Sequence, residues 1–364
     1  MNLLYTQVEE DLRAAVRDLL TDRCRAADVL ARCETEQPYH LDLWRALVRD
    51  LGVTALQVPE RLGGAGASVR ETAVVLEELG AAVAPVPYLG SSVLATEALL
   101  ACDSGLVRDL ATGEQTAVLA VSLAAYPGGD FPEGVKVTDA GLTGRVGTVA
   151  DATVADLLVV PVTGPEGPEI HAVRAADAAV TPLTSLDLTR RIADVTFEDA
   201  ASTRIAAGDT ARDALTTALL AGAGLLASEQ VGLASWCLES TVAHLKQRHQ
   251  FGRPVGSFQA LKHRLADLWQ QLVTARAAAR YAADALATGS DDVPVAVAVA
   301  QSHCAEVAVR AAEECVQLHG GIGMTWEHPA HLYLKRAKSD EIALGTPGRP
   351  GAALAALVDL PAPS

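Results

Sequence analysis

The sequence has no long hydrophobic run and little positive charge. Half of its 364 residues are hydrophobic, yet no stretch reaches the roughly 18 uninterrupted apolar residues expected of a membrane span. Lysine and arginine number 29 against 45 aspartate and glutamate residues, which gives a formal net charge of −16. Nucleic-acid binding depends on neutralising phosphates with basic side chains, so this charge argues against a nucleic-acid partner. The N-terminus has no basic segment followed by an apolar one, which predicts a mature cytoplasmic protein.

Metal-binding and disulfide spacings are also missing. The six cysteines show no CxxC spacing, and the nine histidines show no HExxH or other ligand spacing. Most of the cysteines lie in apolar helical contexts, where a thiol behaves as a small buried hydrophobic group. We therefore expect buried free thiols and no metal site.

The periodicity of the sequence changes twice along the chain, which predicts three domains. Apolar residues recur three and four apart between residues 1 and 114, a pattern typical of helices. Residues 115–206 contain short β-type runs separated by Gly, Pro and Asp turns, which predicts a compact antiparallel β domain. Long helical patterns return in residues 207–364, where small and apolar residues occupy more than one face. The fold class is therefore α+β, in the order α, β, α.

Two segments of the C-terminal region have features suited to phosphate. In KQRHQFGRPVGSFQALKH, Arg248 stands three residues before Phe251 and a Gly/Pro turn that precedes a new helix. A planar guanidinium beside a helix start can bind pyrophosphate, although a helix C-terminus with a cation and a glycine stop gives the same pattern. In QLHGGIG, a glycine pair interrupts a helix. Such a pair allows the close approach of a ligand, or of another helix.

Together these segments resemble the acyl-CoA dehydrogenases. Residues 56–89, 185–199, 228–269 and 317–338 carry the resemblance, which extends over nearly the whole chain. It implies an N-terminal helical domain, a middle antiparallel β domain and a C-terminal four-helix bundle. It also implies α,β-desaturation of an acyl-CoA thioester, FAD as the cofactor, and an electron acceptor similar to electron-transfer flavoprotein.

In this family FAD lies across a subunit interface, and the RxxFG and QxxGG motifs hold its adenine and pyrophosphate half from the neighbouring subunit. The resemblance assigns pyrophosphate binding to Arg248, packing near the adenosine to Phe251, and a contact in the same region to Gln259. Contacts to the adenine end, mainly through backbone, are assigned to Gln317, Leu318, His319, Gly320 and Gly321.

The positions of the family's catalytic base depart from its pattern. Abstraction of the α proton needs a carboxylate, which usually stands directly before a Gly-Thr pair, and here that position is Leu344. The alternative base position, on the helix before RxxFG, falls at about Gly222. Asp340 and Glu341 lie about one turn before Leu344 and are weak candidates. A charged pair near a helix end is usually solvated, and we expect the same here.

The segments that contact the flavin ring in the family depart as well. The TEPxAGSD loop corresponds to the shorter SLAAYPGGD at residues 122–130. A strand that usually places aromatic and threonine residues against the ring reads Val149, Ala150 and Asp151. The adenine-side motif is thus intact, whereas the flavin-ring and base positions are changed.

This asymmetry predicts a subunit of a heteromeric, α2β2-type acyl-CoA dehydrogenase that completes the FAD site of a base-bearing homologue. Such assemblies act in actinobacterial degradation of steroid side chains and related bulky acyl groups. Two alternatives stay open from the sequence: an active homo-oligomer with an unrecognised base, and a non-catalytic scaffold that binds an acyl thioester or a partner. A yellow, active isolated chain would favour the first alternative. A chain that stays colourless with every related partner would favour the second.

Overall fold

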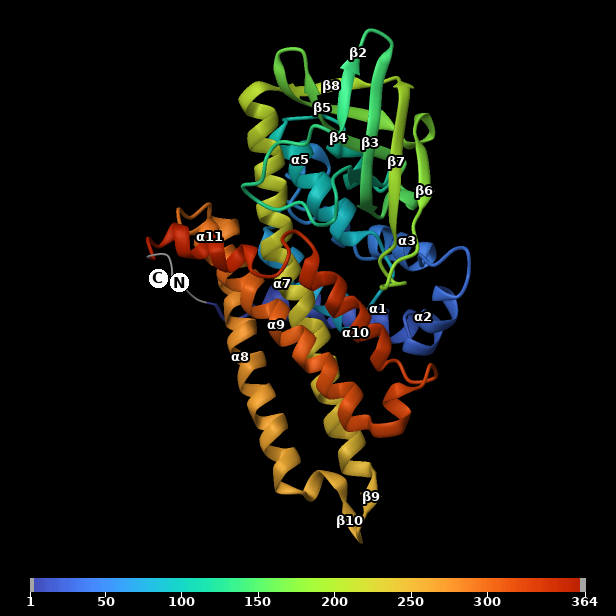
Figure 1. Cartoon of the computed structure of the whole chain (residues 1–364), viewed down its shortest axis with the longest axis vertical. Coiled ribbons are helices and arrows are strands. Elements are labelled where there is room, and N and C mark those ends of the chain that lie inside the picture. Colours follow the sequence, from blue (N-terminus) through green and yellow to red (C-terminus); the bar gives the residue numbers. More distant parts are fainter. Residues whose placement is uncertain (1–2, 361–364) are drawn as a thin grey trace.

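The computed structural model has helices toward both ends of the chain and a β sheet between them (Figure 1). It describes residues 3–360; residues 1–2 and 361–364, at the outer ends of the first and third predicted domains, lie outside this range. The α+β class and the order α, β, α are confirmed.

The N-terminal region is helical up to Ala111. Its elements are α1 (Gln7–Arg23), α2 (Ala26–Cys33), α3 (Leu41–Arg49), the 3-10 turns η1 (Val53–Ala55) and η2 (Glu60–Leu62), α4 (Val69–Ala81), the π-helix η3 (Tyr88–Ala95), α5 (Thr96–Ala101) and α6 (Val107–Ala111). Capping boxes fix the starts of two of these helices, with Thr6 and Glu9 at α1 and Ser68 and Glu71 at α4. In each box the two side chains satisfy backbone N–H groups that the first turn leaves unpaired.

The described strands of the middle region form one sheet. They are β1 (Ala117–Leu119), β2 (Val135–Thr138), β3 (Gly141–Ala150), β4 (Leu157–Gly164), β5 (Gly167–Arg174), β6 (Ala179–Pro182), β7 (Ile192–Ala200) and β8 (Thr203–Ala207), with 3-10 turns η4 (Ala152–Val154) and η5 (Ala175–Asp177) between them. The strand order is β6-β7-β3-β2-β4-β5-β8, and β1 pairs with β4 outside this path. The sheet is mixed at β4, which runs parallel to β1 and β2, while the other pairs are antiparallel as predicted.

Long helices return after the sheet. They are α7 (Gly208–Gln247), α8 (Gln259–Thr288), α9 (Val293–His319), α10 (Ala330–Ile342) and α11 (Arg349–Leu357). A small hairpin, β9 (His249–Gln250) and β10 (Arg253–Pro254), and the turn η6 (Val255–Ser257) join α7 to α8, and η7 (Gly320–Met324) follows α9. Helix α7 runs from the sheet to this hairpin at the far end of the molecule (Figure 1). It is long and apolar enough to cross a membrane, but 89% of its most apolar window is buried inside the protein, as in a core helix.

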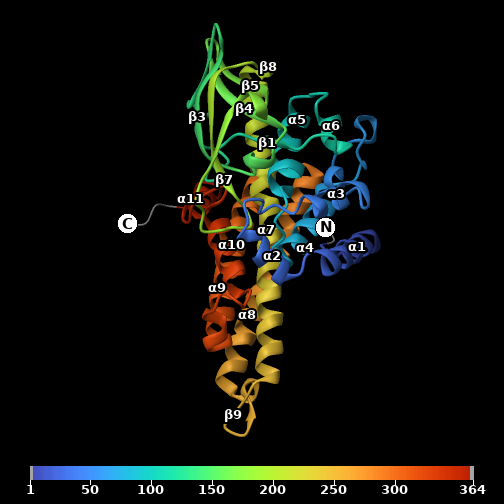
Figure 2. The ribbon, with the colours of Figure 1, turned by 90° about the vertical axis from the view of Figure 1, so that its right-hand side faces the viewer.

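Helices α4 and α7 cross closely because each has a glycine at the crossing. A Cβ added at Gly80 would clash with the carbonyl oxygen of Glu229, and one added at Gly232 would clash with that of Glu77. Only a residue without a side chain fits at either position. Helix α7 therefore lies between the N-terminal helices and α8 and α9 (Figure 2), and one continuous hydrophobic core includes residues from all of them.

Candidate functional site

A predominantly apolar cavity of about 540 Å³ lies between the loop before β2, the beginning of α7, α9 and α11. Leu344 and Gly345 form part of its wall, together with Tyr126, Leu220 and Gln301. Within residues 3–360, no aspartate or glutamate side chain lines this cavity. The cavity can therefore hold an apolar group, but its lining has no carboxylate that could accept a proton.

Leu344 is held firmly in the wall of this cavity. Its side chain is fully buried, and its N–H donates a 2.7 Å hydrogen bond to the carbonyl oxygen of Leu123. Gln301 Nε2 donates a 2.7 Å hydrogen bond to the Leu344 carbonyl oxygen. The φ angle of Leu344 is 55°, in the left-handed region that few residues with a side chain adopt. These hydrogen bonds and the surrounding packing maintain that conformation.

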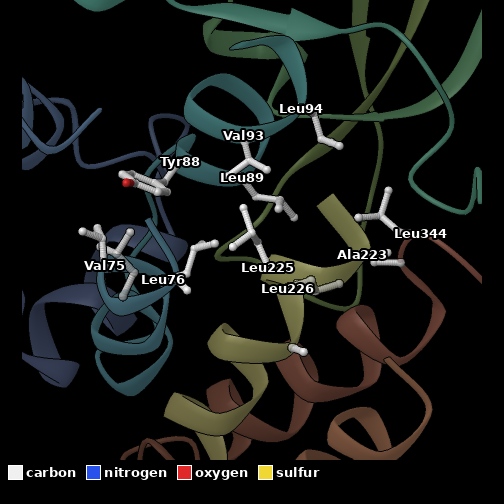
Figure 3. Packing of buried hydrophobic residues seen from close by; sticks show 14 of the residues in the cluster. Val75, Leu76, Tyr88, Leu89, Val93, Leu94, Ala223, Leu225, Leu226 and Leu344 are labelled. Atoms are coloured by element: carbon white, nitrogen blue, oxygen red, sulfur yellow. The ribbon is translucent and has the colours of Figure 1, made fainter. Parts of the chain in front are cut away.

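The two positions where the family resemblance places a base meet in space. A Cβ added at Gly222 of α7 would lie 2.9 Å from Leu344 Cδ1 and would also clash with Leu94 of η3. Figure 3 shows Leu344 beside Ala223 and Leu94, among other buried aliphatic side chains. Neither leucine nor glycine can take a proton, so this corner of the cavity has apolar packing where a base would act.

Asp340 is buried, so the prediction that it is solvated is wrong. It is 1% exposed, and its Oδ1 accepts a 2.5 Å hydrogen bond from Arg190 Nη1. Arg190 also pairs with Glu229 at 2.7 Å, and Arg336 pairs with Glu229 and Asp187 at 2.6 Å each. These partners come from α7, α10 and the segment before β7, which are distant from one another in the sequence. The local sequence around Asp340 therefore does not reveal its burial.

This buried cluster contains one more carboxyl group than guanidinium group. Burial, and then the charge of Glu229, raise the pKa of Asp340 well above its usual range. Its Oδ2 has no hydrogen-bond partner within the described residues. Asp340 is therefore committed to this buried cluster and does not line the cavity, so it is not placed to take a proton from a substrate there. Glu341 is 28% exposed, lies 3.6 Å from Lys338 and is not part of the cavity lining.

Residues 122–130 and 149–151 correspond to the segments that contact the flavin ring in the family, and they have other contacts in this chain. Tyr126 and the residues after it line the cavity, and the guanidinium of Arg349 lies 4.2 Å from the centre of the Tyr126 ring. Asp151 is 1% exposed and accepts a 2.7 Å hydrogen bond from Tyr39 Oη. A Cβ at Gly90 would press against the Asp151 carboxyl group. Asp151 is thus packed against the N-terminal helices, and burial raises its pKa.

The RxxFG residues lie at the opposite end of α7. Arg248 caps the helix through its backbone N–H, and its exposed guanidinium makes no hydrogen bond or ion pair with any described residue. Phe251 is 89% exposed at the hairpin and has a φ of 52°. Gln259 is exposed at the first residue of α8, with its Nε2 3.4 Å from His263 Nε2. A large apolar ring held in solvent by a strained backbone is a feature that calls for a binding partner.

The QxxGG segment ends α9. Gln317 is exposed, Leu318 is half-buried, and the His319 side chain is 3% exposed. Gly320 has a φ of 65° and a ψ of −138°, a backbone conformation that favours glycine. Gly321 has no positive φ, and a Cβ added there would meet nothing within 4 Å. Packing inside this chain therefore does not explain Gly321, and its backbone is open to a ligand.

We call Arg248, Phe251, Gln259 and the segment 317–321 the distal surface. Leu220, in the cavity wall, belongs to α7, and Arg248 directly follows the last residue of this helix. At a rise of about 1.5 Å per residue, the helix places these two residues roughly 40 Å apart. Figure 1 shows the hairpin and η7 region at the end of the molecule away from the sheet. The distal surface and the cavity of one chain therefore belong to separate sites.

Three histidine rings form a cluster at the distal surface, to which His319 itself belongs. The sequence offers no reason to group these three histidines. The His319 ring stands between the rings of His244 and His328, with centroid distances of 4.4 Å and 4.3 Å. The family resemblance assigns to His319 only a contact at the adenine end. The sequence signal that could have placed His244 near the distal surface is its position one helical turn before Arg248.

The cysteines are free thiols, as predicted, and all are buried except the partly exposed Cys102. Within residues 3–360, no group of three or more His, Cys, Asp or Glu side chains is arranged to hold a metal ion.

Two family models match this chain. One describes the N-terminal domain of acyl-CoA dehydrogenases and matches residues 6–105, and the other describes their C-terminal domain and matches residues 195–349. The chain belongs to the acyl-CoA dehydrogenase family, whose members are FAD-dependent. The resemblance seen in the sequence is confirmed.

The similar proteins include acyl-CoA dehydrogenase IpdE2 of Mycolicibacterium smegmatis, which is 36% identical over 342 residues, 94% of this chain and 96% of that protein. Among solved structures, the ChsE4-ChsE5 complex from Mycobacterium tuberculosis contains a chain that is 30% identical, with full coverage of both chains and a TM-score of 0.85. A chain of the Tcur3481-Tcur3483 steroid ACAD is 27% identical, covers 97% of this chain and 98% of its own, and has a TM-score of 0.84.

Proposed function

We propose that this chain is a subunit of a heteromeric FAD-dependent acyl-CoA dehydrogenase and that it completes the FAD site of a base-bearing partner. The proposed assembly is a cytoplasmic α2β2 heterotetramer that desaturates a bulky acyl-CoA, such as a steroid side-chain thioester. An electron-transfer flavoprotein would accept the electrons. Two similar solved structures, the ChsE4-ChsE5 complex and the Tcur3481-Tcur3483 steroid ACAD, support the heteromer and the substrate class.

The observation that carries this proposal is the separation of roughly 40 Å between the distal surface and the cavity. Arg248 and Phe251 are exposed and do not line the apolar cavity of their own chain. A site that uses them must therefore be completed by a second chain. The second chain must also supply the base, because Leu344 and Gly222 occupy the two base positions in this one.

The distal surface fits the adenine and pyrophosphate half of FAD. The Arg248 guanidinium has no partner among the described residues and can form charge-assisted hydrogen bonds to phosphate oxygens. The backbone at Gly321 can be approached closely because no side chain covers it. When bound, FAD supplies the acceptor for the hydride that leaves the acyl chain. In this division of work, our chain binds and orients the cofactor and takes no proton from the substrate.

The direct test is Arg248→Ala in the complex of this chain with its flavin-holding partner. Loss of a charge-assisted contact costs about 1.5–3 kcal/mol, so the FAD dissociation constant should rise about 10–150-fold. The matched control is Arg174→Ala, which removes the same charge from a residue paired with Asp177 in the sheet region. Unchanged FAD retention in Arg248→Ala would reject the proposal.

Cofactor stoichiometry gives a second test. If the flavin-ring half of each FAD belongs to the partner, the complex should contain one FAD per heterodimer, and the isolated chain should contain almost none. The ratio of flavin absorbance to protein mass measures this directly. A full complement of FAD in the isolated chain would support the homo-oligomer alternative instead.

A further inference from the structure

Three histidine rings connect the two halves of the distal surface. His244 belongs to the last turn of α7, His319 is the last residue of α9, and His328 lies in the loop before α10. The interplanar angles are 32° between the first two rings and 45° between the second two. The stack thus joins the helix that presents Arg248 to the segment that presents Gly321.

Backbone bonds link this stack to the distal surface on both sides. The carbonyl oxygen of His244 accepts a 2.9 Å hydrogen bond from the N–H of Arg248. His319 directly precedes Gly320, where the chain leaves α9 in a conformation suited to glycine. If the His244 and His319 rings move apart, Arg248 therefore moves relative to the segment 317–321.

The hydrogen-bond partners limit where protons can be held. His319 Nδ1 lies 2.7 Å from the carbonyl oxygen of Cys315, which can only accept, so this nitrogen carries a proton. His328 Nδ1 accepts a 3.2 Å hydrogen bond from the N–H of Ala330. His244 Nε2 is buried and has no hydrogen-bond partner within the described residues. An additional proton would therefore add charge to rings that are already in close contact.

We propose that His244, His319 and His328 are positioning residues that keep the two halves of the distal surface in register while the stack holds at most one positive charge. The hold of this chain on the adenine and pyrophosphate half of FAD would therefore weaken in acid. This inference rests on the proposed function, since it concerns the same cofactor surface.

The groups that face the outer two rings disfavour their protonation. Burial, followed by the charges of His319 and Arg248, lowers the pKa of His244. Burial, followed by the charges of His319, His244 and His331, lowers the pKa of His328 to about 4.

The central ring has a different environment. Burial lowers the pKa of His319, but hydrogen bonds to the side chain and backbone of Cys315 outweigh this effect and raise it overall. The Cys315 thiol lies 3.6 Å from His319 Nδ1, on the same side as this carbonyl contact. The first proton therefore goes to His319, and charge repulsion opposes a second on either neighbour.

The sign of the pH effect follows from these directions. An imidazole whose pKa is lowered by folding binds fewer protons in the folded chain than in the unfolded chain. Its contribution to stability is complete above the ordinary histidine pKa of about 6.5 and is lost as the pH falls below it. For His328 the loss extends down to a pH of about 4. FAD binding to the folded chain should weaken as the pH falls toward the lowered pKa values that the outer two imidazoles have in the folded state.

His244→Phe is the informative variant, because it keeps an aromatic ring and removes a nitrogen that has no hydrogen-bond partner among the described residues. FAD retained by the complex is measured by ultrafiltration from pH 5 to pH 8. We expect the wild-type dissociation constant to rise at least tenfold between pH 7.5 and pH 5, and that of His244→Phe to rise less than threefold. At pH 7.5 the two should agree within about twofold.

Two further variants separate positioning from a general structural effect. His303→Phe removes a histidine whose Nε2 lies 2.8 Å from the Thr274 hydroxyl, away from the stack, and should keep the wild-type profile. His244→Ala removes the ring itself and should weaken FAD binding at every pH. A His244→Phe profile that runs parallel to the wild-type profile would overturn the positioning role.

An NMR titration of the imidazoles in the isolated full chain tests the stack without FAD. We expect His328 to titrate well below 6.5 and His319 above His244. Three independent titrations near 6.5 would overturn the inference even if Arg248→Ala releases FAD as proposed. Conversely, unchanged FAD retention in Arg248→Ala at pH 7.5 would reject the proposed function while leaving the titration result intact, so the two failures are distinguishable.

Discussion

Replacing Leu344 with glutamate asks whether a carboxyl group alone can restore proton abstraction in this chain. The new side chain would stand at the family's base position, beside Gly222 and Leu94. Tyr126 and the shortened loop around it would remain part of the cavity wall. Proton and hydride transfer must be coupled, so a base without an ordered hydride acceptor cannot complete the reaction. We therefore expect no dehydrogenation by the isolated Leu344→Glu chain.

The stability cost follows from the burial of the site. Leu344 is fully buried, and placing a neutral carboxyl group there without a hydrogen-bond partner costs about 1–3 kcal/mol. Burial also raises the pKa of the introduced acid in the folded state above its ordinary value of about 4.3. The unfolded chain then releases this proton first. The loss of stability therefore grows as the pH rises above 4.3, by up to about 1.4 kcal/mol per pH unit, until the folded-state pKa is reached.

Two assays examine this variant, with Leu344→Gln as the uncharged control. Urea unfolding at pH 5 and pH 8 should show a pH-dependent loss of stability in Leu344→Glu and a nearly constant loss in Leu344→Gln. Reduction of an electron acceptor by the isolated chain with a pool of acyl-CoA thioesters should stay at background in both. Turnover gained by Leu344→Glu, or equal stability losses in the two variants at both pH values, would refute this reasoning.

Four other variants have defined outcomes. Asp340→Asn, combined with Glu341→Gln, should leave the turnover of the complex nearly unchanged, and a hundredfold fall with FAD retained would identify a base there. Asp340→Asn alone should gain stability relative to the wild type in urea unfolding as the pH rises from 4 to 8, because the pKa of Asp340 is raised in the folded state. A variant that loses relative stability over this range would contradict this. Gly80→Ala should lower the free energy of unfolding by about 1–3 kcal/mol, because the new Cβ clashes with α7. Gly321→Ala should have a free energy of unfolding within about 0.5 kcal/mol of the wild type, because nothing lies near the new Cβ. It should nevertheless bind FAD about tenfold more weakly. Normal FAD binding by Gly321→Ala would show that no ligand approaches that backbone.

The long helices were predictable because their apolar periodicity extends over many turns, but α11 and η3 were not. Glycine and proline in GTPGRPG favour the end of a helix, whereas Pro350 lies in the first turn of α11, where a missing N–H costs nothing. The prolines and glycine of residues 84–90 favour a break in the chain, yet a helical form begins at Tyr88. Strands β6 and β8 are short and largely exposed, so they lack the alternation that identifies a strand.

The candidate site was predictable where it depends on local motifs. Arg248 and Gly321 were identified from RxxFG and QxxGG, and their roles remain predictions that FAD binding must test. The burial of Asp340 was not predictable, because Arg190, its hydrogen-bond partner, is 150 residues away in the sequence. The histidine stack was not predictable either, since three separate elements contribute its rings and no spacing pattern unites them.

The glycine crossing of α4 and α7 also affects how cooperatively this protein unfolds. The carbonyl oxygen of Glu229 lies beneath Gly80, and the carboxylate of the same residue neutralises Arg190 and Arg336. Detaching the N-terminal helices would thus admit water to the turn of α7 that anchors the buried charges. It would also expose to water the apolar core that the N-terminal helices share with α7, which is too costly for a partly folded state to persist. We therefore expect one cooperative unfolding transition, and a protease that cuts between α6 and β1 should leave the two pieces associated.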